Sequence, residues 1–325
     1  MMFDGQIPAF NMPMGPGSQD ESEDGEVLNY MPMPKEMASY DMPVLPDEAE
    51  VSDLPELRQL LDTLLIHLRQ FEQNGESQQL DLKQWPKKST ELLSQILGEG
   101  EVSILVDQGQ LAQRMGAQNA VCEPDSMSEQ DVVSKWQIQE TVLAGVWRIQ
   151  SLNAQGEMLV DMIEVASIPQ QVISTAFDSA ELPDLNTWFN DKPVDVMNAP
   201  MVLIELRDQA ARVIDEGTDK QKFPHVVNLS LLPVSPRDLD YIQQMLGVGP
   251  VTILSRGYGN CRITATHLPN TWWVQYYNSG DQLILNTVEV CAIPEVALAA
   301  KEDIEDSIER LIEIQQAYQA EPEED

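Results

Sequence analysis

The sequence contains few basic residues. Its 325 residues include 19 Lys and Arg against 54 Asp and Glu, which gives a formal net charge of −35. A protein that binds free nucleic acid needs clustered Lys and Arg to displace counterions from phosphates. Attraction to anionic membrane surfaces depends on the same residues. The charge therefore argues against both of these functions and favours partners that are proteins.

Cysteine and long apolar runs are also scarce. Cys122, Cys261 and Cys291 are widely spaced and odd in number, which excludes a disulfide framework and suits a reducing compartment. No apolar run approaches the roughly 18 to 20 residues of a membrane span, and no basic region followed by an apolar core indicates a signal peptide. We expect a cytoplasmic protein without membrane insertion. Its length suggests two domains.

Residues 1–52 differ in composition from the rest of the chain. They mix Pro, Gly and acidic residues, and they contain eight of the 15 Met residues without helical or strand periodicity. This composition is typical of a disordered arm. The Met side chains could be soft ligands for copper(I), but adaptable apolar anchors that dock onto a surface are the favoured interpretation.

A leucine-rich helix is predicted after this arm, in "SDLPELRQLLDTLLIHLRQF", with Asp53 as N-cap and Glu56 closing a capping box. Next comes "ILGEGEV" (96–102), which resembles a phosphate-binding loop. Its glycines, however, follow a short helix capped by Ser89 or Thr90 and precede a strand. A dinucleotide-binding loop has the reverse order. Gly98 is predicted to end the helix in the left-handed conformation.

The same pattern returns as "MLGVGPV" at 245–251, again between a helix and a strand. In addition, residues 141–169 align without gaps to 266–294, which pairs Trp147 with Trp272 and Glu164 with Glu289. We interpret this as an internal duplication in which the glycines form a structural joint that each copy needs.

The predicted fold is α+β, with two duplicated repeats of helix, strand, helix and mostly antiparallel strands. The first repeat spans 53–177 and contains a polar inserted loop at 107–135. A linker at 178–197 leads to the second repeat, 198–325, which ends in a C-terminal helix. In that helix, Ile304, Ile308, Leu311 and Ile312 are predicted to pack inward.

Candidate chemistry is concentrated in "SRGYGNCRITATH" (255–267), which has no counterpart in the first repeat. A tight hairpin explains the segment without any further function. A metal site of Cys261, His267 and Cys291 lacks the paired ligand spacing of zinc and iron–sulfur sites. A Cys261–His267 nucleophile pair lacks an orienting third group. No established catalytic motif occurs, so we predict no catalytic residue, no metal and no cofactor.

The second repeat is expected to carry the partner-binding surface, because it differs from the first at this hairpin and has Trp273 where the first has Arg148. Trp273 should face away from Trp272, because successive strand residues alternate. Tyr, Trp and Arg often dominate interface energies. The candidate partner-binding residues are Arg256, Tyr258, Cys261, Trp273 and Cys291.

Several segments carry a family resemblance: "GPGSQ", "LGEGEVS", "GVWR", "RGYGNCRI", "VEVCAIPEV" and "KEDIEDSIERL". Together they resemble the HupH/HyaF family of hydrogenase expression proteins, from about residue 14 to residue 315. The resemblance implies an accessory protein for uptake [NiFe] hydrogenases that acts on the iron–sulfur small-subunit precursor. A thioredoxin-like hydrogenase chaperone is an implied co-partner. The family provides no catalytic residues to transfer.

The resemblance leads to the expectation of a cytoplasmic chaperone that binds the precursor before assembly and is not an enzyme. The Met-rich arm suits reversible covering of apolar surface, with modest affinity because ordering the arm opposes binding. The alternative is a metal or iron–sulfur cluster carrier that uses Cys261 and Cys291.

Overall fold

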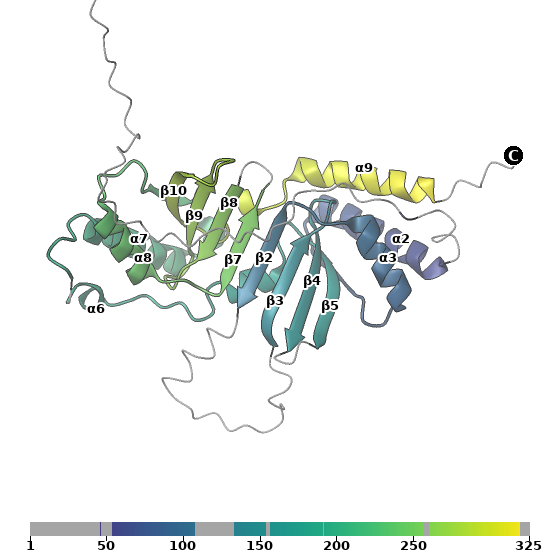
Figure 1. Cartoon of the computed structure of the whole chain (residues 1–325), viewed down its shortest axis with the longest axis horizontal. Helices are drawn as coiled ribbons and strands as arrows, with labels where there is room; N and C mark the ends of the chain where they lie inside the picture. Colours follow the sequence, from purple (N-terminus) through teal and green to yellow (C-terminus); the bar gives the residue numbers. More distant parts are fainter. Residues whose placement is uncertain are drawn as a thin grey trace, which may run out of the picture. The chain divides into compact units, whose positions relative to one another are not determined.

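The computed structural model describes residue 46 and residues 54–107, 133–153, 157–190, 192–256 and 260–318. Within these residues, ten strands form a single sheet, and all pairings given for neighbouring strands are antiparallel. Helices cover parts of the sheet (Figure 1). The predicted α+β class with antiparallel strands is therefore confirmed.

The first half of the sheet contains five strands: β1 (Gln78–Asp81), β2 (Val102–Asp107), β3 (Val133–Glu140), β4 (Val146–Asn153) and β5 (Met158–Val165). The second half contains β6 (His225–Asn228), β7 (Val251–Ser255), β8 (Asn260–Ala265), β9 (Thr271–Tyr277) and β10 (Leu283–Val290). Read from the outer edge to the centre, the first half has the order β1-β5-β4-β3-β2 and the second β6-β10-β9-β8-β7. Both halves thus use the same strand order, and they join through β2 and β7.

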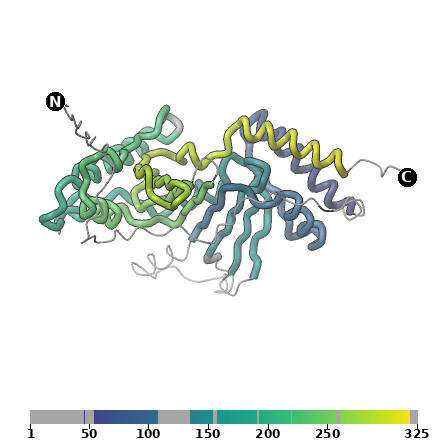
Figure 2. Tube along the Cα trace, turned by 45° about the horizontal axis from the view of Figure 1, so that its top comes forward, coloured from purple at the N-terminus to yellow at the C-terminus, as the bar shows by residue number. Residues whose placement is uncertain are grey.

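Helices connect and cover these strands. The described α-helices are α2 (Pro55–Asn74), α3 (Lys87–Leu97), α5 (Gln170–Thr175), α6 (Leu185–Phe189), α7 (Ala199–Glu216), α8 (Pro236–Leu246) and α9 (Lys301–Ala317). Two 3₁₀ turns, η1 (Thr218–Lys220) and η2 (Glu295–Ala297), complete the set within the described ranges. The C-terminal helix α9 packs beside α2, at the other end of the described chain (Figure 2).

Three apolar clusters fill the core. One lies between the first half of the sheet and α2, α3 and α9, and another lies between the second half and α7 and α8. The third covers the opposite face across both halves, beneath α5 and η2. Trp272 belongs to this third cluster, whereas Trp273 packs against the α7–α8 cluster. The prediction that these two indoles face opposite sides of β9 is confirmed.

The glycine pairs occupy joints between a helix and a strand in both halves. Gly98 and Gly247 end α3 and α8 with positive φ values of 56° and 65°. The second glycine of each pair passes close to the neighbouring strand: Gly100 N–H donates to Glu140 O, and Gly249 N–H donates to Ala265 O, both at 2.7 Å. A Cβ at Gly100 would lie 2.2 Å from the Thr141 carbonyl oxygen. These contacts explain why glycine is needed at the second position.

Some predicted helix ends were wrong. Helix α2 begins at Pro55 with Leu54 at the N-cap position, one residue after the predicted cap Asp53. Helix α3 begins at Lys87 after Pro86, so Ser89 and Thr90 lie inside it. Pro55 is the first residue of α2, where its fixed φ suits a helix start, and Pro86 is at the N-cap position of α3.

Two further expectations need correction. The ψ of −166° takes Gly98 out of the predicted left-handed helical conformation. In α9, Ile304 and Leu311 are buried as predicted, but Ile314 joins the core while Ile312 is only half-buried.

The segment between the halves contains packed structure. Helix α6 places Trp188 in the α7–α8 cluster, where it is 7% exposed. Strand β2 ends at Asp107 and strand β3 begins at Val133, so both ends of the predicted inserted loop are strand, and residues 108–132 lie outside the described residues. The predicted arm lies outside the described residues except for Pro46, as do Cys122 and Tyr258.

Candidate functional site

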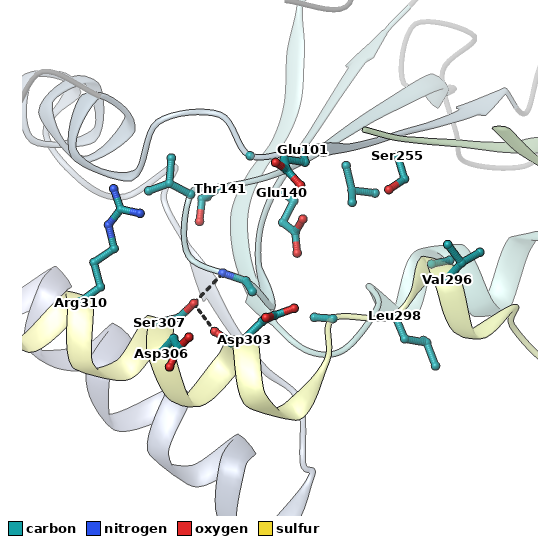
Figure 3. A pocket seen from close by; sticks show the side chains of 16 residues that line it. Glu101, Glu140, Thr141, Ser255, Val296, Leu298, Asp303, Asp306, Ser307 and Arg310 are labelled. Atoms are coloured by element: carbon teal, nitrogen blue, oxygen red, sulfur yellow. Dashed lines mark hydrogen bonds between the residues drawn. The ribbon is translucent and has the colours of Figure 1, made fainter. Parts of the chain in front are cut away.

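A pocket of about 580 Å³ lies where the first half, the end of β7 and α9 meet (Figure 3). Its walls come from the loop before β2, the turn between β3 and β4, Ser255 at the end of β7, and the segment from η2 into α9. These segments are far apart in the sequence. The pocket therefore exists only because α9 docks onto the first half of the fold.

The turn between β3 and β4 is fixed to α9 by specific contacts. Ala144 N–H donates to Ser307 Oγ at 2.8 Å, and Ser307 Oγ donates to Asp303 O at 2.7 Å. Gly145 has φ 75°, and a Cβ there would lie 3.2 Å from Ile304 Cγ1. A side chain at this position would be both strained and crowded. Glycine thus allows α9 to approach the turn closely.

Carboxylates dominate the pocket. Glu101, Glu140, Asp303 and Asp306 line it together with a single guanidinium, that of Arg310. Figure 3 shows the Glu140 side chain between Glu101 and Asp303, with Arg310 on the other side of the turn. With all four acids ionised and Arg310 charged, the lining would carry a formal charge of about −3. The pocket is therefore suited to cationic ligands.

Glu140 is the most perturbed of these acids. Its side chain is only 8% exposed, and burial raises the pKa to about 7, with smaller contributions from the charges of Glu101 and Asp303. The Gly145 N–H, 3.3 Å from Glu140 Oε1, acts in the opposite direction by stabilising the carboxylate. Near neutral pH, Glu140 can therefore exchange a proton or respond to a nearby cation.

The hairpin singled out by the sequence adjoins this pocket. Arg256 N–H donates to Glu101 O at 3.1 Å, and the preceding residue, Ser255, lines the pocket. Arg256 itself is half-buried. The strands that flank the predicted hairpin are present, with Ser255 opposite Cys261.

The two described cysteines are buried side chains of the second half. Cys261 is 1% exposed and Cys291 7% exposed. Burial, followed by the charge of Glu289, raises the pKa of each thiol to about 12. A metal ligand or nucleophile must be a thiolate. Among the described residues, no three His, Cys, Asp or Glu side chains form a group that could hold a metal ion.

Cys261 also has a packing role. It lies opposite Tyr276 on β9, whereas the corresponding cross-strand pair of the first half is Trp136 opposite Ser151. The large and the small member of the pair have exchanged strands. Each half thus places one aromatic ring and one small side chain between the two strands, which explains a cysteine here without any reactive role.

Trp273 is half-buried, and its Nε1 donates to Asn286 Oδ1 at 2.6 Å. In the first half the corresponding positions hold an ion pair, Arg148 Nε to Asp161 Oδ1, also at 2.6 Å. The two pairs bridge corresponding strands, β4 and β5 in the first half and β9 and β10 in the second. The difference that the sequence indicated at Trp273 is therefore a replacement of one cross-strand pair by another.

The structure does not gather the five candidate partner-binding residues into one exposed surface. Arg256 lies beside the pocket, Cys261 and Cys291 are buried in the cluster shared by both halves, Trp273 packs under α7 and α8, and Tyr258 lies outside the described residues. Their role in binding stays a prediction. Sequence reasoning missed Glu101, Glu140 and Asp303, because three carboxylates do not stand out among 54 acidic residues.

Comparison with known proteins gives consistent matches. The C-terminal conserved region of HupH hydrogenase expression proteins matches residues 126–183 and 196–318. The hydrogenase expression/formation protein HupQ of Azotobacter chroococcum mcd 1 is 43% identical over 94% of this chain and 96% of its own length. The protein HoxQ of Azotobacter vinelandii, with the same description, is 41% identical over 96% of this chain and 99% of its own.

A solved structure, the hydrogenase expression protein HupH from Thiobacillus denitrificans ATCC 25259, is also similar. It shares 23% identity with 37% of this chain and 96% of its own length, at a TM-score of 0.34. None of the described helices is long and apolar enough to cross a membrane.

Proposed function

Because the chain belongs to the family of HupH hydrogenase expression proteins, we propose that it is an accessory protein in the maturation of an uptake [NiFe] hydrogenase. It binds the iron–sulfur small-subunit precursor as a chaperone before the subunits assemble. The observation that carries this proposal is the match to hydrogenase expression/formation proteins along 94% of the chain. The excess of acidic residues supports a protein partner over a nucleic acid.

The protein acts by binding and not by catalysis. Both described thiols are buried and have raised pKa values, and the pocket beside α9 is lined by four carboxylates. Such a pocket suits recognition of cationic groups. A thioredoxin-like hydrogenase chaperone is proposed as a second partner, and the cytoplasm as the place of action.

We also infer that the fold consists of two duplicated repeats, 53–177 and 198–325, separated by the linker 178–197 and preceded by the arm 1–52. The shared strand order supports this inference. So do matching hydrogen bonds: Thr141 N–H donates to Val146 O and Thr266 N–H to Thr271 O, while each threonine Oγ1 bonds the residue two positions on. The arm is proposed to contribute its Met residues as apolar contacts with the precursor.

An affinity-capture experiment tests the proposed function. The tagged protein is expressed together with the complete hydrogenase operon, and captured material is probed for both hydrogenase subunits. We expect the small-subunit precursor to be captured before processing, and the mature small subunit to be absent. The tag fused to an unrelated acidic protein is the control. Capture of neither subunit, or equal capture of precursor and mature forms, would contradict the proposal.

A cluster carrier that uses Cys261 and Cys291 is the competing function, and iron analysis separates the two. Protein purified without oxygen during hydrogenase expression should contain no stoichiometric iron or acid-labile sulfide. A bound cluster that is lost in the Cys261→Ser, Cys291→Ser double variant would establish the carrier in place of the chaperone.

A further inference from the structure

The buried carboxylate of Glu140 is not required by the local fold. The last residue of β3 corresponds to the last residue of β8, because Glu140 lies opposite Trp147 and Ala265 lies opposite Trp272. At both positions the backbone carbonyl accepts the N–H of the second joint glycine at 2.7 Å. The second half thus builds the same joint with alanine. Burying an ionisable group without need destabilises a protein, so Glu140 calls for a reason other than folding.

A second, independent feature points into the same pocket. Ser255, at the end of β7, is 6% exposed and lines the pocket, and no hydrogen bond joins its hydroxyl to the described residues. This oxygen is not among the fully buried unpartnered side-chain atoms of the described chain, so it borders the open space of the pocket and can accept a hydrogen bond from a ligand there. Glu140 Oε1 accepts from Gly145 N–H, while Oε2 has no donor within the described chain. Two acceptor oxygens from different strands are therefore left for a ligand.

The charge of the pocket decides the kind of ligand. Glu101 and Asp303 both raise the pKa of Glu140 through their charges, so the three carboxylates act on the same space. The described carboxylates do not form a group that could hold a metal ion. A cation with several donors on a larger frame fits better, and a guanidinium offers five N–H donors in a plane.

The wall of the pocket opposite Arg310 is apolar. Val296 of η2 and Leu298, which follows η2, lie there (Figure 3). An aliphatic stem can pack on such a wall while its charged end reaches the carboxylates. Arg310 neutralises only one of the four acids, so negative charge remains.

We propose that this pocket binds an arginine side chain of a protein partner, with the guanidinium between Glu140, Glu101 and Asp303 and the Ser255 hydroxyl accepting one N–H. Only the identity of the protein that carries this arginine, a hydrogenase subunit precursor, rests on the proposed function. Binding of the cation favours the ionised form of Glu140. Affinity should therefore be higher at pH 8 than at pH 6; the other charged groups that line the pocket are Glu101, Asp303, Asp306 and Arg310.

The pocket is tested with a small probe on the full-length protein. N-acetylarginine amide is titrated into protein with ¹³C-labelled glutamate, and the Glu140 carboxyl resonance is followed by NMR. We expect saturable binding in the millimolar range, a fall of the Glu140 titration midpoint, and binding at least tenfold weaker with the neutral isostere N-acetylcitrulline amide. Binding of N-acetyllysine amide at equal or higher affinity would overturn the choice of arginine.

Two variants test whether Glu140 forms part of the binding site. Glu140→Ala copies the residue that the second half uses and should fold, but it should weaken probe binding at least tenfold, as followed by the remaining resonances. Glu309→Gln, an exposed acid on α9 outside the pocket, should bind the probe like the wild type. Unsaturable binding, equal binding of arginine and citrulline probes, or binding unaffected by Glu140→Ala would overturn the proposal.

A second experiment repeats the precursor capture with the Glu140→Ala variant. Loss of capture supports a precursor arginine in the pocket. If capture is undiminished although probe binding is lost, the precursor does not supply the arginine, and the proposed function still stands. If the wild type captures no precursor but binds the probe, the proposed function fails while the pocket remains an arginine site.

Discussion

Trp147 on β4 and Trp272 on β9 occupy matching places on corresponding strands of the two halves, and both are 0% exposed. The Trp147 indole donates to Ala166 O at 2.9 Å, and the Trp272 indole donates to Ala292 O at 3.1 Å. Each bond fixes the segment after the following strand, β5 or β10, to the core.

Replacing either indole should therefore weaken the two halves alike. Trp147→Phe and Trp272→Phe each remove a buried hydrogen bond and part of a ring, which should lower the free energy of unfolding by about 2 kcal/mol. Urea unfolding measures the loss. A loss for one residue together with no change for the other would mean that the halves do not share a common packing scheme.

The joint glycine Gly100 tolerates no side chain. Gly100→Ala places Cβ against the Thr141 carbonyl, so the strand must move, and we expect a loss of about 2 kcal/mol or more. Gly280→Ala is the control, because its Cβ would make an ordinary contact at 3.4 Å from Asn278 Oδ1. Thermal unfolding compares them, and equal melting temperatures would contradict the role of Gly100.

Glu140 should make stability depend on pH near neutrality. Its folded-state pKa, about 7, lies above the ordinary 4.5, so folding favours the protonated carboxyl group. The stability that this protonation contributes is fully present below about pH 4.5 and is lost as the pH rises through 7. Glu140→Gln should remove up to about 3 kcal/mol of this dependence. Urea unfolding at pH 5 and pH 8 measures it, with Glu309→Gln as control. An unchanged dependence would show that Glu140 titrates normally.

Asp238 joins α8 to the start of α7. Its Oδ1 accepts backbone N–H groups of Met197, Asn198 and Ala199, and its Oδ2 accepts the N–H and the hydroxyl of Ser235. Burial alone would raise the pKa of Asp238, but these hydrogen bonds together hold it well below the usual range.

Asp238→Asn should therefore destabilise the protein by about 2 to 3 kcal/mol at pH 7 through loss of the charged acceptor. The wild-type advantage is fully present above the unfolded-state pKa, near 4, and declines as the pH falls from there toward the lower folded-state value. Urea midpoints measured from pH 7 down to pH 3 check both statements. A variant that is equally stable at pH 7 would contradict them.

The described thiols should be unreactive in the folded protein. In a Cys122→Ala background, Cys261 and Cys291 should react with a thiol-specific disulfide reagent only after addition of denaturant, because both are buried with pKa values near 12. Release of the coloured thiolate follows the reaction. Rapid stoichiometric labelling of the folded protein would show that a thiol is accessible after all.

The sequence by itself determined the local parts of this protein. The α+β class, the helix before and the strand after each glycine joint, and the opposite orientations of Trp272 and Trp273 followed from spacing and from the comparison of one half with the other. These features depend on neighbours within a few residues, where side-chain periodicity and glycine conformation act directly.

Only the tertiary structure decided how distant segments meet. The pairing of β2 with β7 joins both halves into one sheet, and the docking of α9 beside α2 closes the pocket around Glu140. The burial of Glu140, and the packing of Cys261 against Tyr276, depend on which strands become neighbours. The free energy of a charge or a thiol is set by its surroundings in space, and no local pattern among 54 acidic residues could distinguish the one carboxylate that becomes buried there.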